Sequence, residues 1–182
     1  MFDERSEDLL MARYADGDDH ALEVLFDRLA PRVFAFLRCS PGEPERAELL
    51  LQSTFVQLHR SRRDFPRGTS ARTWVLSIAA SLQRKPVRRL RWLNGSRART
   101  VNVEVIVQKA EGQRERAVRE VIAGLQEEER QLLHLHRFEG LSFEQIAQVV
   151  GSSEAAIRER AVGSYRQLRE RLLLLVNNGG RS

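Results

Sequence analysis

Apolar side chains recur every three or four residues along most of this 182-residue chain, and this helical spacing limits the possible fold more than any other feature. Leu22, Leu25, Phe26 and Leu29 form one such stripe, and later segments repeat the pattern. Hydrophobic residues make up 42% of the chain, which is enough to build a packed core. The sequence therefore predicts an all-α protein.

The helical pattern falls into two modules, residues 5–93 and 115–176. Between them, residues 94–114 open with Asn94 and Gly95 and sustain no 3.6-residue stripe. We interpret this stretch as a flexible linker, with a short strand-like piece as an alternative for part of it. Within the first module, Pro31 predicts a new helical turn or a kink. The expected architecture is two small helical modules joined by a linker.

The second module contains a helix-turn-helix pattern over residues 141–169. Ser142 and Gln145 have the spacing of a capping box, in which each side chain binds a free backbone N–H at the start of a helix. Gly151 suits the left-handed residue that ends a helix, and Ser152 or Ser153 can cap the next one. This arrangement can place a helix in the major groove of DNA, although it also occurs as plain helix packing.

The start of the second helix carries small and charged residues that can face base pairs. Arg158 and Arg160 can reach phosphates or a guanine edge. Glu159 would repel phosphates, although it can accept a hydrogen bond from a cytosine amino group. The DNA-contacting residues predicted for this helix are Ser153, Ala155, Ala156, Arg158, Glu159 and Arg160.

The charge of the chain is distributed unevenly. The net charge is +5, but residues 60–99 carry 12 basic side chains and one acidic one, whereas residues 1–59 carry six basic and 12 acidic ones. Nearly all the basic residues are arginines, which stay charged at any ordinary pH. The basic block should attract polyanions, with an affinity that falls steeply with salt, and nucleic acid is the leading candidate. A solvated basic helix face or a membrane-surface segment is the alternative.

Several other classes of function lack their signatures. A single cysteine, Cys39, excludes a disulfide framework and a cysteine-rich zinc site. His134 and His136 are two residues apart, so on a helix they point in different directions and make a poor metal pair. No phosphate-binding loop, nucleophile elbow or dinucleotide fingerprint occurs in the sequence. We therefore expect no enzymatic activity, no cofactor and no metal site.

The hydropathy pattern offers no membrane-inserted segment. The longest apolar run, residues 172–176, is far too short to span a bilayer. The N-terminus is acidic and lacks the apolar core of a secretory signal. The sequence thus predicts a soluble protein of the cytoplasm.

The order of the motifs resembles a known family. Residues 125–151 are similar to the LPxxxRxxLxLRxxEGLSxxEIAxxLG run of region 4 in bacterial sigma factors. In the first module, residues 30–37 resemble the APRVYRFL segment of region 2, residues 47–55 a divergent AEDLTQEVF, and residues 72–79 RTWLYRIA. Two modules and a short linker resemble the extracytoplasmic-function (ECF) group. The resemblance covers residues 8–175.

This resemblance implies partners for each module. The helix over residues 47–58 would dock on the clamp helices of the largest subunit of core RNA polymerase, through Leu49, Leu51, Gln52 and Phe55. The loop at 65–71 and the next helix would capture the −10 element of promoter DNA, through Arg67, Arg72, Trp74, Arg84, Lys85, Arg88 and Arg89. The helices over 142–172 would read the −35 element and contact the flap of the second largest subunit. An anti-sigma factor is a further partner expected from the family.

The chain departs from the family pattern at functional positions. Leu49 and Leu51 replace an Asp and a Thr, which either creates an apolar contact surface or adds leucines to the core. Ser81 replaces an Asn, and Pro86 should kink or end its helix. The resemblance supports an ECF sigma factor that binds core polymerase and directs initiation. The alternatives are a sigma-like DNA-binding regulator that does not melt promoters, and a protein-interaction adaptor.

Overall fold

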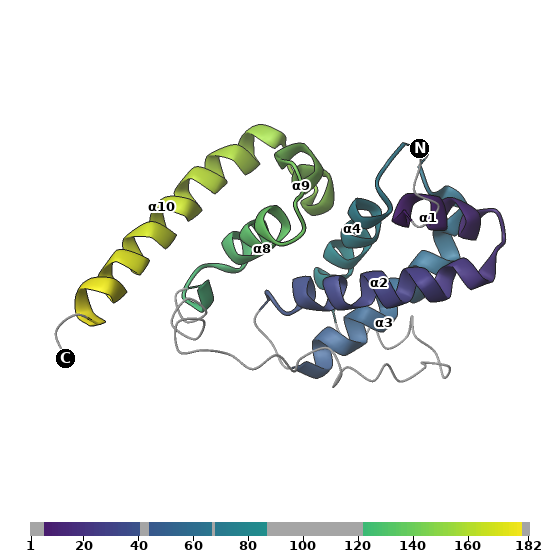
Figure 1. The fold of residues 1–182 in the computed structure, drawn as a ribbon, viewed down its shortest axis with the longest axis horizontal. Helices are drawn as coiled ribbons and strands as arrows, with labels where there is room; N and C mark the ends of the chain where they lie inside the picture. The colour runs from purple at the N-terminus through teal and green to yellow at the C-terminus, as the bar shows by residue number, and fades with distance from the viewer. Residues whose placement is uncertain (1–5, 41–43, 67, 87–121, 180–182) are drawn as a thin grey trace.

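The fold is known from a computed structural model that describes residues 6–40, 44–66, 68–86 and 122–179 (Figure 1). All regular structure in these ranges is helical, which confirms the predicted fold class. The first group of helices is α1 (Glu7–Ala15), α2 (Asp19–Leu37), α3 (Pro44–Ser61), the short 3-10 helix η1 (Arg62–Asp64) and α4 (Ala71–Gln83). The second group is α8 (Glu127–Arg137), α9 (Phe143–Val150) and α10 (Glu154–Gly179). The predicted linker, residues 94–114, lies outside the described residues.

Local sequence signals account for several helix ends. The Ser6 hydroxyl accepts a hydrogen bond from the Leu9 N–H at 3.2 Å and so caps α1. Asp18 plays the same part for α2, where its carboxylate accepts from the His20 N–H at 3.2 Å. The end of α4 at Gln83 falls three residues before Pro86, as expected for a residue that cannot continue a helix.

Pro31 does not begin a new helix, because α2 continues through it to Leu37. Buried Leu29, Val33 and Phe34 lie on both sides of the proline. Burial of these side chains stabilises the segment. It offsets the loss of the one backbone hydrogen bond that a proline cannot donate.

The first four α-helices enclose a core of large side chains. Tyr14, Leu25, Phe36, Leu50 and Leu76 are each at most 2% exposed, and they come from α1, α2, α3 and α4. Burial of such side chains stabilises the module by about 1.5–3 kcal/mol each. The four helices are thereby fixed relative to one another.

The two helix groups also pack against each other. Helix α9 lies on α4, and α8 contacts α2 (Figure 1). Buried residues of both groups belong to one continuous hydrophobic cluster. Within the described ranges, no helix has the length and apolar character needed to cross a membrane.

Candidate nucleic-acid interface

The turn between α9 and α10 is built as the sequence predicts. The Ser142 hydroxyl accepts from the Gln145 N–H at 3.2 Å, and the Gln145 side chain accepts from the Ser142 N–H at 2.9 Å. Gly151 ends α9 in the left-handed region, with φ at 71°. The Ser153 hydroxyl accepts from the Ala156 N–H at 3.2 Å, so Ser153 caps α10. These contacts fix the angle at which α10 leaves the turn.

Helix α10 has one buried side and one exposed side. Ile157 and Ala161 are only 1% and 2% exposed and join the core. On the opposite side, Ala155, Glu159 and Val162 are exposed and follow one another at spacings of four and three residues. Val162 is 69% exposed. Sequence reasoning missed this valine, although its helical spacing from Ala155 and Glu159 was a usable signal.

The two arginines predicted to contact DNA on α10 have different surroundings. Arg158 is exposed, lies 2.5 Å from the Glu154 carboxylate, and stacks its guanidinium 5.3 Å from the centroid of the Phe143 ring. Arg160 is exposed but lines a cavity of about 530 Å³ between the two modules. Ala156 is half-buried. Only part of the predicted set, with Val162 added, therefore shares the outer face of α10.

The residues predicted to contact the −10 element are only partly described. Trp74 is half-buried, packs on the core and lies 5.2 Å from the Phe65 ring, centroid to centroid. Arg84 is exposed, and its guanidinium donates to the Val150 carbonyl at 3.5 Å. Lys85 is half-buried. Arg67, Arg88 and Arg89 lie outside the described residues.

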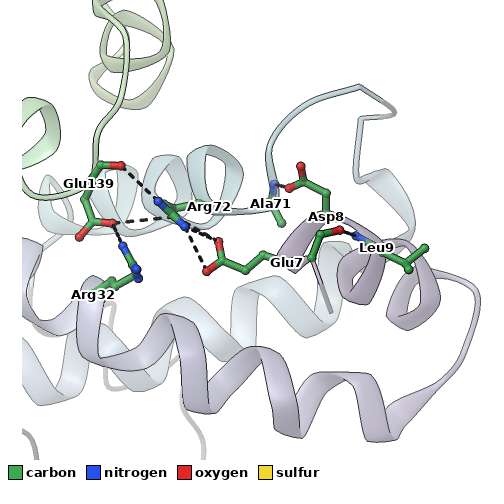
Figure 2. Close-up of polar contacts among 8 residues, drawn as sticks. Glu7, Asp8, Leu9, Arg32, Ala71, Arg72 and Glu139 are labelled. Atoms are coloured by element: carbon green, nitrogen blue, oxygen red, sulfur yellow. Dashed lines mark hydrogen bonds and ion pairs between the residues drawn. The ribbon is translucent and has the colours of Figure 1, made fainter. Parts of the chain in front are cut away.

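Arg72, also predicted to contact DNA, is held by two acidic residues (Figure 2). Its guanidinium pairs with the Glu7 carboxylate at 3.0 Å and donates to the Glu139 backbone carbonyl at 3.2 Å. The Asp8 carboxylate next to Glu7 accepts from the Ala71 N–H at 2.7 Å and thereby caps α4. In this conformation Arg72 joins α1, α4 and the turn that follows α8.

The Leu49–Leu51 region of α3 is mostly core rather than surface. Leu51 is fully buried, and Phe55 is 9% exposed and packs on Phe26 with ring centroids 4.6 Å apart. Leu49 and Gln52 are half-buried. Because Leu51 and Phe55 present almost no surface, Leu49 and Gln52 remain as the candidates for direct contact with polymerase.

Glu139 is the acidic residue that sequence reasoning did not single out. Its side chain is 4% exposed, and its carboxylate lies 3.1 Å from Arg32 and 4.0 Å from Arg72 (Figure 2). The His134 ring nitrogen lies 3.6 Å from the same carboxylate. Burial alone would raise the pKa of Glu139, but the neighbouring His134 and Arg32 hold it below its usual value. Glu139 is therefore ionised at neutral pH. The two arginines lie 67 and 107 positions from Glu139 in the chain, so no local motif predicts these ion pairs.

Comparison with known proteins agrees with this arrangement. The family model for sigma-70 region 2 matches residues 25–93, and the model for sigma-70 region 4 matches residues 115–163. The chain is 34% identical over 165 residues to the RNA polymerase sigma factor CarQ of Myxococcus xanthus, covering 89% of this chain and 95% of that protein. It is 26% identical over 173 residues to the ECF RNA polymerase sigma factor SigK of Mycobacterium sp. strain KMS, covering 89% and 88% respectively.

Solved structures show the same fold. The sigma factor RpoE in its complex with the anti-sigma factor NepR from Bartonella quintana superposes with a TM-score of 0.61 at 22% identity, over 85% of this chain and 96% of that one. CnrH in complex with the cytosolic domain of CnrY gives a TM-score of 0.58 at 21% identity, over 91% and 96%.

A two-module helical chain that carries sigma region 2 and region 4 is a promoter-specificity subunit of bacterial RNA polymerase. This chain belongs to the ECF family of RNA polymerase sigma factors. As a member, it binds core RNA polymerase and directs promoter recognition and transcription initiation. The two alternatives, a regulator that does not start transcription and an adaptor, are not favoured by these relatives.

Proposed function

We propose that α10 reads the −35 element through its outer face. The observation that carries this proposal is the exposure of Ala155, Arg158, Glu159 and Val162 on one side of a capped recognition helix. Arg158 would contact a phosphate or a guanine edge, and Glu159 a cytosine amino group. Val162 would contact the methyl group of a thymine. Ser153, at the helix N-terminus, would hold the DNA backbone.

The −10 element would be captured by α4 and the segments on either side of it. Arg67, Arg84, Lys85, Arg88 and Arg89 would supply positive charge for the separated strand. Trp74 packs on the core beside Phe65. It would therefore form part of the wall of this site and would not stack on a DNA base. Arg72 would reach DNA only after it leaves Glu139.

For core polymerase, α3 would dock on the clamp helices of the largest subunit, with Leu49 and Gln52 at the contact. The second module would reach the flap of the second largest subunit. In this division, residues 5–93 form the first module, 94–114 the linker and 115–176 the second module. The protein would act in the cytoplasm, without enzymatic activity, and an anti-sigma factor would regulate it; RpoE is found in complex with the anti-sigma factor NepR.

The test is run-off transcription with core polymerase and upstream DNA from the organism that encodes the chain. Arg158→Glu should lower the transcript yield by about tenfold or more, because one good base contact is worth about 1–3 kcal/mol. Binding to core should be unchanged. Arg38→Glu, which reverses an exposed charge in the first module, serves as the matched control.

Full transcription by the Arg158→Glu variant would contradict the role of α10 in reading the −35 element. Binding of the unaltered protein to core without any transcript would instead revive the regulator alternative.

A further inference from the structure

One buried carboxylate lies in the contact between the two modules. Glu139 belongs to the second module, in the turn between α8 and α9, and its side chain is 4% exposed. Arg32 of α2 and Arg72 of α4 approach it from the first module (Figure 2). A carboxylate removed from water is costly unless it is paired, so these arginines compensate for its burial. They can do so only while the modules are in contact.

Other polar contacts cross the same boundary. The Ser40 hydroxyl, after α2, donates to the Glu127 carboxylate at 2.5 Å, and the Gln131 amide donates to the Ser40 oxygen at 3.0 Å. Arg130 donates to the Cys39 backbone carbonyl at 2.8 Å. Polar contacts exchange readily for water. Apolar side chains of the two modules also pack together across this boundary, so opening it exposes apolar surface as well.

The closed arrangement is incompatible with a promoter of two separated elements. Helix α9 of the DNA-reading motif lies directly on α4, the helix assigned to the −10 element (Figure 1). The names of the two elements place their centres about 25 base pairs apart, or about 85 Å along B-form DNA. A chain in which the −35-reading module packs on α4 cannot span that distance. The modules must separate before both elements are bound.

We propose that Glu139 with Arg32 and Arg72, which we call the Glu139 latch, holds the free protein in a closed state that cannot initiate transcription. This proposal rests on the assignment of α4 and α10 to the two promoter elements. Opening the latch exposes the Glu139 carboxylate to water and leaves Arg72 paired with Glu7 within the first module. After opening, neither the Glu139 carboxylate nor the Arg72 guanidinium is buried without a partner. The latch can therefore open and close reversibly. Core polymerase would select the open state from this equilibrium.

The test compares the full chain with Glu139→Gln, which keeps the shape of the side chain and removes its charge. Arg32→Gln breaks the latch from the other module, and 40% of the Arg32 side chain is exposed, so its loss should not disturb the core. Glu170→Gln makes the same charge change at an exposed site on α10 and is the matched control. Circular dichroism melts show that each variant is folded.

Two quantities are measured, the radius of gyration by small-angle X-ray scattering and the apparent Kd for core polymerase. Both latch variants should have a larger radius of gyration than the unaltered protein. Loss of one charge-assisted contact should raise the open fraction about tenfold, and the apparent Kd should fall by up to the same factor. Glu170→Gln should change neither.

An unchanged radius of gyration and Kd in both folded latch variants would overturn the proposal. If no variant, including the unaltered protein, bound core, the proposed function would fail instead. The scattering data alone would then decide whether the latch exists.

Discussion

At the scale of single residues, Val162 is 69% exposed on the outer face of α10, where an apolar side chain gains nothing from water. The methyl group of thymine is the apolar feature that the major groove offers. We predict that Val162→Ala weakens promoter binding by the holoenzyme about fourfold, the equivalent of about 0.8 kcal/mol for a lost methyl contact. A competition assay between promoter fragments measures this change.

Uracil substitution makes the same prediction specific to one base. Replacing each −35 thymine in turn by uracil removes only its methyl group. One position should then cost the unaltered protein about fourfold in affinity and cost the Val162→Ala variant nothing. Uracils outside the element are the control. Equal penalties in the two proteins would show that Val162 does not read that methyl group.

Some contacts of single residues could be predicted from the sequence, and others could not. The capping box at Ser142 and the glycine at 151 were predictable, because each depends on neighbours within a few positions. The partners of Arg72 were not, since Glu7 and Glu139 lie 65 and 67 positions away. An arginine in a basic segment suggests a contact with a phosphate. Only the structure shows which carboxylates of the protein lie close enough to pair with it.

At the scale of elements, helical spacing predicted where the helices lie in the chain. It did not always predict which face of a helix is buried and which is exposed. For the three leucines of α3, the sequence left open an apolar contact surface or a place in the core. In the fold, Leu50 and Leu51 are at most 2% exposed, and only Leu49 is partly accessible. The spacing of Ala47, Leu51 and Phe55 already marked one face of that helix as core. The direction of that face relative to α2 and α4 required the structure.

The turn between α9 and α10 yields a prediction with an internal control. Gly151 has φ at 71°, where any side chain is strained, whereas Gly163 lies within α10 and has open space where a Cβ would stand. Gly151→Ala should lower the free energy of unfolding by about 1–2 kcal/mol. Gly163→Ala should raise it by about 0.5–1 kcal/mol, because alanine is the better helix former. Urea denaturation of both variants measures the difference.

Equal effects of the two alanines on stability would contradict the left-handed end of α9. A turn that accepts alanine at position 151 would also leave the angle of α10 less well fixed, and with it the outer face assigned to the −35 element.

At the scale of the whole molecule, closure of the two modules should depend on pH through His134. Burial alone would lower the pKa of His134, but Cys39 and Glu139 together raise it from 6.5 to about 9. Cys39 belongs to the first module, so part of this raised pKa exists only in the closed state. The other charged groups around the contact are the guanidinium groups of Arg32, Arg72 and Arg130, which stay charged at ordinary pH, and the carboxylates of Glu7 and Glu127.

The sign of the pH effect follows from this arrangement. The Cys39 contact holds a proton on His134 more tightly in the closed state, so this contribution to closure is lost as the pH rises through about 9. On the acid side, Glu139 has a lowered pKa, so its contribution is present above its usual value of 4.5 and is lost as the pH falls through the lowered one. Closure should therefore be strongest between these limits.

We predict that the radius of gyration of the unaltered protein increases as the pH is raised from 7 to 10. His134→Gln should remove most of this increase, and His20→Gln, at an exposed histidine of α2, should leave it intact. Small-angle scattering at several pH values, with circular dichroism to show that the helices persist, measures the change. An identical increase in the His134→Gln variant would mean that other groups open the modules, because Arg32 and Arg72 keep their charge over this range.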